Sequence, residues 1–350
     1  YSHTYQRYEN ATVASFRGAT DDPRGYEDLV TYEADQGISS VRWGAFGKLS
    51  LLAGNDHKIT VSGFHSQLAD DITSEFEGYN REVQNTYHTT QMDWIERGLT
   101  FGMLSGRHTF PGLKRAELGW DVALSKAYRY EPDRRDTVYL FSERIPDPDD
   151  ETGRGRTQGW VYENKTESGR HFWAEQTEKS NGGKIDYRQP ILEGKTDLAA
   201  KFGGLVNVKR REFNVRRFQF NPEVEGASTN DPVYSCIGET YSGACADKLF
   251  QDENIGRYLW LADGSQEGDA YKASLDVYAG YLMGDVDFSD RLRVVAGVRM
   301  EHTRQKVDPY TPFGDPIPEQ NTKLVATDWL PAASLVFSAT KKIKTRLSYG

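Results

Sequence analysis

The sequence predicts an all-β fold, a transmembrane β-barrel built as an antiparallel up-and-down meander with long extracellular loops. Three observations predict it: apolar and polar residues alternate with a period of two, tight turns alternate with long polar segments, and the chain is polar overall. Hydrophobic residues make up 37% of the 350 residues, and the mean hydropathy is −0.70. A membrane barrel accommodates this composition because only every second residue of each strand has to be apolar.

The two-faced pattern is clearest between residues 292 and 301. One series consists of Leu292, Val294, Ala296, Val298 and Met300, and the alternate series of Arg293, Val295, Gly297, Arg299 and Glu301. A period of two is typical of an extended strand whose two faces meet different surroundings. We therefore predict that one face touches an apolar medium and the other a wet one.

The same alternation recurs along the chain, and each apolar series extends for about ten residues, the length of a strand that crosses a bilayer. The other predicted apolar series are Val41, Trp43, Ala45, Leu49 and Leu51; Ala116, Leu118, Trp120, Val122 and Leu124; Leu198, Ala200, Phe202, Val206 and Val208; Ala273, Leu275, Val277, Ala279, Tyr281 and Met283; and Trp329, Pro331, Ala333, Leu335 and Phe337. Phe46 interrupts the polar series of its strand.

The connections between these strands alternate in length. Tight turns are predicted at GNDHK, GRHTFPGL, LEGK, SD and TKK. Long polar loops are predicted at 17–38, 69–90, 131–175, 221–270 and 308–324. Long structureless loops are uncommon in compact soluble domains, whereas membrane barrels carry short turns on one rim and long loops on the outer rim.

A membrane-spanning sheet has to close on itself because hydrocarbon offers no water to unpaired backbone groups. The apolar series would then face lipid, and the polar series would face an aqueous lumen. The lumen-facing residues predicted on this basis are Asp276, Tyr278, Arg293, Arg299 and Glu301. Asp276, Arg293, Arg299 and Glu301 are expected to contact a solute or a plug in the lumen, or to form ion pairs across strands within the wall.

The chain contains two cysteines, Cys236 and Cys245, in the loop sequence SCIGETYSGACA. Their closeness favours a disulfide that closes this loop in an oxidising compartment, and two free thiols are the alternative. Two cysteines without a neighbouring histidine do not make a zinc site. We therefore predict neither a metal site nor a cofactor.

The charge and the motifs exclude several functions. The net charge is −9, and no basic stripe with interleaved aromatic residues occurs, so no nucleic-acid partner is expected. The sequence contains no HExxH, Walker A, GxSxG or dinucleotide-binding motif, and we predict that the protein is not an enzyme. It contains no apolar run long enough for a transmembrane helix.

Aromatic and arginine side chains in the predicted outer loops are the candidates for binding a small-molecule or glycan ligand, because they give stacking and charge-assisted contacts. The predicted ligand-binding residues are Arg134, Arg135, Tyr139, Phe141, Trp160, Tyr162, Trp173, Tyr241 and Trp260. The alternative is structural: such aromatics form a girdle at the membrane interface or pack loop against loop.

Several phrases resemble the barrel of TonB-dependent receptors. They are GAFGKLSLLAGNDHKITVSGFHSQ, LKRAELGWDVALSKAYRYEPDRRDTVYLF, LRVVAGVRMEHTRQKVD and DWLPAASLVFSATKKIKTRLSYG, whose ending R-L-S-Y departs from the family's L-R-x-S-Y. The resemblance implies a barrel of roughly 22 strands with a plugged lumen, to which residues 1–350 contribute about half. It implies that the plug, the coupling segment and the closing strands lie outside this sequence.

The same resemblance implies a receptor in the outer membrane of a Gram-negative cell, in contact with membrane lipid. It would take up a scarce solute, with siderophore-bound iron as the default, using energy supplied by a TonB-type protein that engages an N-terminal region. Glycans, cobalamin or peptides are the other solute classes. The alternatives are a passive porin-type channel, an outer-membrane barrel enzyme, and a secreted β-sandwich or adhesin.

Overall fold

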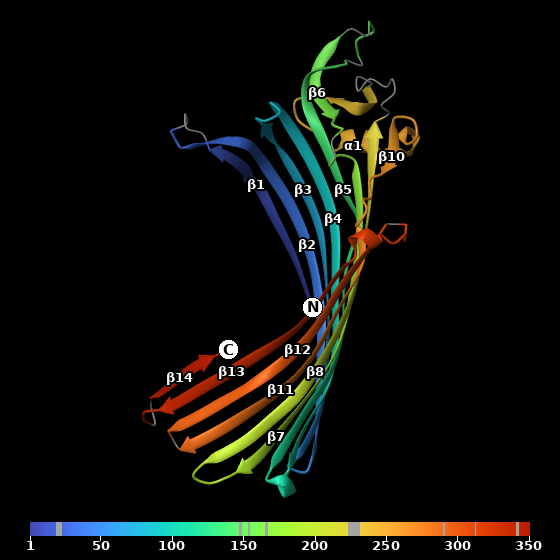
Figure 1. Ribbon diagram of the computed structural model, residues 1–350. Helices are drawn as coiled ribbons and strands as arrows, with labels where there is room; N and C mark the ends of the chain where they lie inside the picture. The colour runs from blue at the N-terminus through green and yellow to red at the C-terminus, as the bar shows by residue number, and fades with distance from the viewer. Residues whose placement is uncertain are drawn as a thin grey trace.

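A computed structural model shows one antiparallel sheet of 14 strands, and the predicted all-β meander is confirmed (Figure 1). The main path runs β1-β2-β3-β4-β5-β7-β8-β11-β12-β13-β14, and the short strands β6, β9 and β10 pair beside it. The strands are β1 (Ser2–Gly18), β2 (Tyr26–Ala53), β3 (His57–Asn80), β4 (Asn85–Phe110), β5 (Ala116–Pro146), β6 (Arg156–Tyr162), β7 (Arg170–Leu192), β8 (Asp197–Pro222), β9 (Ser235–Ile237), β10 (Leu259–Asp263), β11 (Ala270–Ser289), β12 (Leu292–Tyr310), β13 (Thr322–Ser338) and β14 (Lys344–Tyr349).

Among the residues that the structure describes, helical structure is confined to short elements in the connections. They are η1 (Pro111–Leu113), η2 (Pro232–Tyr234), α1 (Ala244–Leu249), η3 (Asp252–Asn254) and η4 (Pro318–Gln320). The structure describes residues 1–18, 23–146, 149–152, 155–164, 167–222, 232–289, 291–311, 313–340 and 343–350. Within these ranges no helix is long and apolar enough to cross a membrane.

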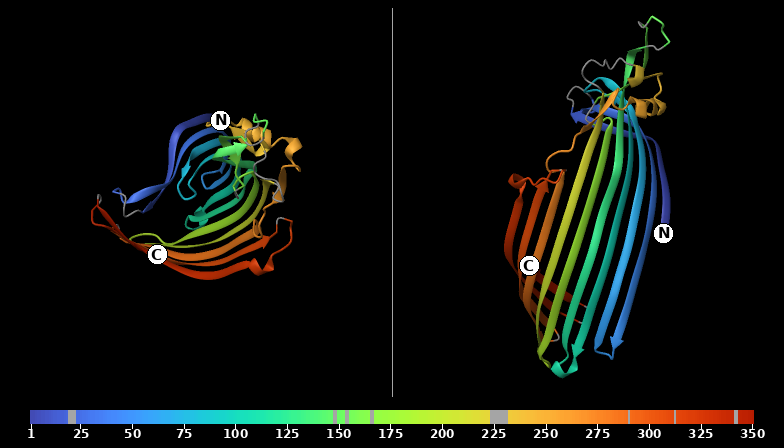
Figure 2. Two further views of the ribbon diagram at one scale, coloured as in Figure 1. Left: turned by 90° about the horizontal axis from the view of Figure 1, so that it is seen from above. Right: turned by 90° about the vertical axis from the view of Figure 1, so that its right-hand side faces the viewer.

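The sheet curves strongly and stays open, with β1 and β14 as its two edges (Figures 1 and 2). We call the end with the tight turns the inner end and the end with the long connections the outer end. At the outer end, the segment that carries α1 and β10 lies against the convex side of the curve (Figure 1). The two sides of the sheet therefore differ before any side chain is considered.

The cross-strand register aligns the apolar residues of successive strands on one face. Directly opposed residues of an antiparallel pair point to the same side. Leu49 of β2 lies opposite Val61, Val61 opposite Leu104, and Leu104 opposite Val122. The result is a belt of exposed apolar side chains, which we call the apolar belt: Trp43, Leu49, Leu51, Val61, Leu104, Val122, Leu124, Ile185, Phe202, Val206, Leu282, Val298, Met300, Trp329, Leu335 and Leu347.

The apolar belt lies on the convex face. Leu104 and His88 stand on the same face of β4, since the pairing of β4 with β3 is unbroken between them. His88 stacks on Tyr241 of the convex segment, with ring centroids 3.8 Å apart. An apolar convex surface is the one that lipid solvates in a barrel wall.

The concave face carries charged side chains joined across strands. Asp285 of β11 accepts hydrogen bonds from Arg293 at 2.7 and 2.8 Å and from Lys201 at 3.1 Å. Arg211 of β8 donates to Glu178 of β7 at 2.6 and 2.9 Å. These ion pairs satisfy the charges of a wall whose concave side is crowded by its curvature.

The predicted lumen-facing residues do not all share one face. Arg293, Arg299 and Glu301 stand on the concave face, because Arg293 lies opposite Asp287 and Glu301 opposite Ala279. The register places Asp276 and Tyr278 on the convex face, contrary to the prediction, since Tyr278 lies opposite Val206 of the apolar belt. Both residue series of β11 contain apolar side chains, so alternation alone could not assign its faces.

Two predicted loops are mostly strand, so their boundaries were wrong. β2 already begins at Tyr26, within the predicted loop 17–38. Strands β3 and β4 fill most of 69–90, leaving only residues 81–84 between them. Beyond the apolar belt these strands have polar residues on both faces, so the alternation that marks a strand in the sequence disappears although the pairing continues.

The other three predicted loops also lose residues to the flanking strands. β5 extends to Pro146 and β7 begins at Arg170, so strands take up both ends of 131–175. The predicted loop 221–270 contains β9, α1 and β10, while 308–324 is irregular mainly between β12 and β13. The long connections nevertheless all lie at one end of the sheet, as the meander predicts.

Glycines on β4 leave room for aromatic rings of β5. A Cβ atom at Gly106 would lie 2.2 Å from Nε1 of Trp120, and one at Gly98 would lie 2.1 Å from Cε1 of Tyr128. The Trp120 indole N–H donates to Nε2 of His108 at 3.1 Å. The rings thus cover the glycine backbone and fill the convex surface where no side chain is present.

We predict that Gly106→Val destabilises the folded barrel by about 1–3 kcal/mol, because the new side chain displaces the Trp120 ring from its site. Gly102→Val is the matched control, since it lies on the same face of β4 and a Cβ there meets nothing within 4 Å. Heat-modifiable electrophoresis and tryptophan fluorescence of the full-length protein measure the effect. Equal melting of the two variants would contradict this role of the glycine.

Candidate functional site

The outer end of the sheet carries a packed core of its own, which we call the outer-end core. Its buried members come from β5, β6 and the 232–263 segment, and they are Tyr139, Trp160, Tyr162, Tyr234, Cys245, Leu249 and Leu259. The hydroxyl of Tyr162 donates to the Phe220 carbonyl at 2.8 Å, and that of Tyr234 to the Tyr258 carbonyl at 2.5 Å. Packing and these hydrogen bonds hold the segment against the strand extensions.

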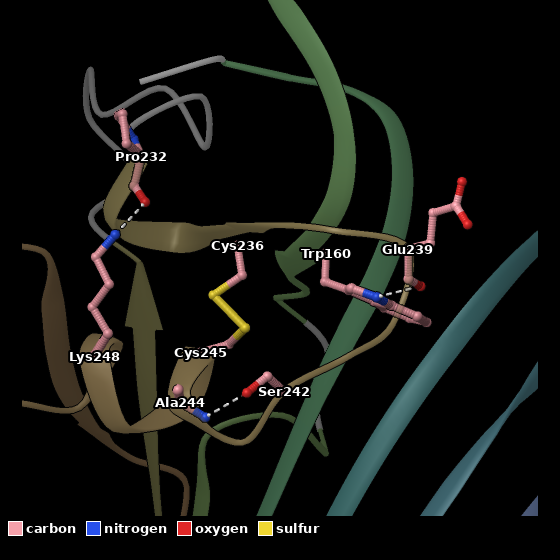
Figure 3. The surroundings of a disulfide bond; sticks show 8 residues. All are labelled: Trp160, Pro232, Cys236, Glu239, Ser242, Ala244, Cys245 and Lys248. Atoms are coloured by element: carbon pink, nitrogen blue, oxygen red, sulfur yellow. Dashed lines mark hydrogen bonds between the residues drawn. A yellow bond between two sulfur atoms is a disulfide. The ribbon is translucent and has the colours of Figure 1, made fainter. Parts of the chain in front are cut away.

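A disulfide between Cys236 and Cys245 closes the loop before α1 (Figure 3). The two Cα atoms are 5.7 Å apart, a usual separation for a disulfide. Around it, the Trp160 indole donates to the Glu239 carbonyl at 3.2 Å and the Lys248 ammonium to the Pro232 carbonyl at 3.1 Å. The covalent bond and these contacts hold α1 beside β6.

A cavity of about 630 Å³ lies between this segment and the convex side of the wall. Its lining mixes both signs of charge with aromatic and apolar side chains. The charged lining residues are Glu75, Arg135, Asp136, Arg170, His171, Asp247 and Asp252, and the apolar and aromatic ones include Met92, Phe220, Tyr241, Phe250 and Ile255. A cavity of this size and character suits a polar small molecule with an apolar part.

Histidines position two parts of the cavity wall. Nδ1 of His171 lies 2.5 Å from Asp133, and the same carboxylate accepts hydrogen bonds from Arg135 at 2.6 and 2.9 Å. Nδ1 of His88 lies 3.0 Å from Glu77, while its ring stacks on Tyr241. His88 is buried, so it links the strand extension of β4 to the disulfide-closed loop.

The tyrosines of the outer-end core remain neutral at physiological pH. Burial raises the pKa of Tyr139 and of Tyr162, and it raises the pKa of Tyr241 to about 12, with a hydrogen bond to Thr90 acting in the opposite direction. A neutral phenol can donate a hydrogen bond, whereas a phenolate cannot. Tyr162 uses this donor on the Phe220 carbonyl, whereas the Tyr139 hydroxyl is buried and makes no hydrogen bond to the described residues.

The concave side of the same region is organised around Asp136, which is 3% exposed. Its carboxylate accepts hydrogen bonds from Gln91 at 2.7 Å and from Arg170 at 2.8 Å, and Nε of Arg134 lies 3.5 Å away. That Nε atom is buried and makes no hydrogen bond to any described residue. This arginine is thus ion-paired with Asp136 through an atom that is shielded from solvent.

The structure separates the predicted ligand-binding residues into three groups. Tyr139, Trp160 and Tyr162 are only 1, 1 and 2% exposed within the outer-end core, in agreement with the alternative of loop packing. Arg135 and Tyr241 line the cavity. The remaining predicted residues lie outside both groups, and they are Arg134 near Asp136, Phe141 against Trp160, Trp173 between His171 and Phe218, and the exposed Trp260 on β10.

Several residues of this region had no signal in the sequence. His88, Glu77 and Asp133 are scattered singly along the chain, and only strand register and loop folding bring them to their partners. Asp136 follows the Arg134–Arg135 pair, and its charge could have marked it. Among the described residues, no group of three His, Cys, Asp or Glu side chains is arranged to hold a metal ion.

Comparison with known proteins identifies one family. A family model described as TonB dependent receptor-like, beta-barrel matches residues 53–350. No curated protein sequence matches the chain. Among solved structures, the siderophore receptor PiuA from Acinetobacter baumannii is similar with 9% sequence identity and a TM-score of 0.37. The likeness covers 97% of this chain and 48% of that one, so the chain spans about half of its length.

We predict that the double variant Cys236→Ala, Cys245→Ala loosens the outer-end core without unfolding the sheet. Closing a loop of this length stabilises the folded state by about 2–3 kcal/mol. Limited proteolysis of the full-length protein should show faster cleavage within 232–258, while heat-modifiable electrophoresis still shows a folded barrel. Wild-type protein treated with a reductant should behave alike, and resistance of the variant equal to that of the oxidised protein would contradict the prediction.

Proposed function

Since the chain belongs to the family of TonB-dependent receptor-like β-barrels, we propose that it forms part of the wall of a receptor that takes up a scarce solute. The family places the chain in the outer membrane of a Gram-negative cell. Ferric siderophores are the proposed solutes, and the proposed energy source is a TonB-type protein that acts through a region preceding this wall. The protein acts as a transporter and carries out no covalent chemistry on its solute.

One observation carries this proposal: the sheet has an apolar convex belt and a charged concave face along the same strands. On β12, the residues on the face of the apolar belt are apolar from Leu292 to Met300, a span of nine residues that is enough to cross a bilayer. A soluble sandwich would bury such a belt against a second sheet, yet Leu282 and Trp329 are 60% and 65% exposed. This distribution supports a wall between lipid and an aqueous path.

The concave side of the outer end supports a role in receiving the solute. Arg134 is ion-paired with Asp136 through a buried Nε that makes no hydrogen bond to the described residues, and its side chain is 30% exposed beside Arg170. Ferric siderophores present carboxylate, catecholate or hydroxamate oxygens, which arginine binds with charge-assisted hydrogen bonds. We propose that Arg134 contacts the solute and that Arg293, Arg299 and Glu301 line its path farther along the wall.

The cavity on the convex side has a different proposed part. Arg135 and Tyr241 line it from the convex face, and it is also bordered by Asp136 and Arg170, which the register places on the opposite face of the wall. We propose that the residues around this cavity hold the disulfide-closed loop in place. The loop and the strand extensions would then form one entrance. The buried aromatics Tyr139, Trp160 and Tyr162 would then contribute to binding by holding this shape.

We predict that cells producing the full-length receptor accumulate radioactive iron from a ferric siderophore only while the TonB-type protein and the proton gradient are intact. Binding of the siderophore to whole cells should persist when either is removed, because capture requires no energy. Uptake that continues without energy would indicate the porin alternative. Hydrolysis of the siderophore by the purified receptor would indicate an enzyme.

We predict that Arg134→Gln weakens siderophore binding about tenfold, the loss expected for one charge-assisted hydrogen bond. Arg135→Gln is the matched control, since it removes the same charge at the next residue, on the opposite face of β5. Equilibrium binding to the purified full-length receptor measures both. A loss of affinity with Arg135→Gln and none with Arg134→Gln would place the solute on the convex side and overturn the proposed path.

A further inference from the structure

A row of basic side chains runs across the sheet along one line of directly opposed positions. Lys126 of β5 lies opposite Lys179 of β7, and Lys179 lies opposite Arg210 of β8. The line continues through Ser274 of β11 to Lys306 of β12 and Lys323 of β13. We call Lys126, Lys179, Arg210, Lys306 and Lys323 the cationic row.

The cationic row stands on the convex face, toward the outer end of the strands. On β5, Lys126 lies two residues after Leu124, and on β8, Arg210 lies two residues after Val208. The row therefore lies on the same face as the apolar belt. All five side chains are exposed. The row therefore meets whatever surrounds the wall just outside the hydrocarbon.

Like charges in directly opposed positions of a sheet destabilise it, because their Cβ atoms are only about 5 Å apart. Three cations of the row, Lys126, Lys179 and Arg210, occupy adjacent strands with no residue between them. Counter-charges near these side chains offset the repulsion. The neighbouring acids compensate some cations of the row and leave others without an ion-pair partner.

Three acids of this face already form ion pairs, and two of them pair with members of the cationic row. Asp276 pairs with Arg210 at 2.5 Å, Asp308 with Lys306 at 2.8 Å, and Glu212 with Lys272 at 3.5 Å. Within the described part of the chain, no acidic side chain lies within ion-pair distance of Lys126 or Lys179. The protein thus leaves a pair of adjacent lysines uncompensated directly above a surface that lipid covers.

We propose that Lys126 and Lys179, with Arg210 beside them, bind phosphate groups of an anionic lipid headgroup in the outer leaflet of the membrane. The apolar belt below them contacts the acyl chains of the same lipid, so the site is one for a phosphorylated lipid and not for free phosphate. Ammonium groups near an anionic lipid surface each contribute favourably to binding. This site lies on the opposite face from the solute path and does not depend on it.

The proposal can be tested with the full-length protein in detergent, titrated with bis-phosphorylated lipid A and followed by native mass spectrometry. The test variant is the double substitution Lys126→Gln, Lys179→Gln, and the matched control is Lys209→Gln, which removes a lysine at the same level from the concave face. Removing two lysines should weaken lipid binding about 30-fold, roughly fivefold for each, while the control changes it less than twofold.

Two further measurements distinguish binding of a phosphorylated lipid from binding of free phosphate. Wild-type protein should bind the dephosphorylated lipid far more weakly, and inorganic phosphate at the same concentration should not displace bound lipid A. Equal binding of the phosphorylated and dephosphorylated lipids, displacement by inorganic phosphate, or unchanged binding by the double variant would each overturn the proposal. The wild-type comparison requires no substitution, so it decides the question even if the double variant does not fold.

Discussion

Backbone pairing in a medium without water is the constraint on which this structure depends. An unpaired N–H or C=O group in hydrocarbon costs several kcal/mol, so a chain can cross only as helices or as continuously paired strands. The sheet meets this condition with unbroken registers, such as the pairing of β3 with β4 from His57 to Asn80. Strand length, turn placement and curvature all follow from keeping that pairing intact across the bilayer.

Once the pairing is fixed, the two faces are free to differ, and they do so along the part of the strands that bears the apolar belt. The convex face exposes a belt of apolar side chains to lipid. The concave face joins charges across strands, as Asp285 does with Lys201 and Arg293. Bulky rings on the convex side lie over glycines of the next strand, as Trp120 lies over Gly106, so that the surface stays continuous.

Outside the bilayer the same strands follow a different physical rule. Water now solvates both faces, so side-chain alternation is no longer required and polar residues occupy both series. Stability comes instead from a local core, in which Tyr139, Trp160 and Tyr162 pack around a loop closed by the Cys236–Cys245 disulfide. Aromatic residues that suggested a ligand surface in the sequence are used here to bury the loop, and the candidate site is formed around them.

The sequence alone determined the fold class, the meander and the order of strands, because the apolar period of two is a local property that each crossing strand must have. It also determined the family, through phrases such as those around Leu292–Met300. It could not determine which face of β11 is convex, because both residue series of this strand contain apolar side chains. The pairing of Tyr278 with Val206 and of Leu282 with Val298 assigns the faces. The partners of Asp136, the stacking of His88 on Tyr241 and the cationic row were equally decided by the tertiary structure, because register joins residues far apart in the chain.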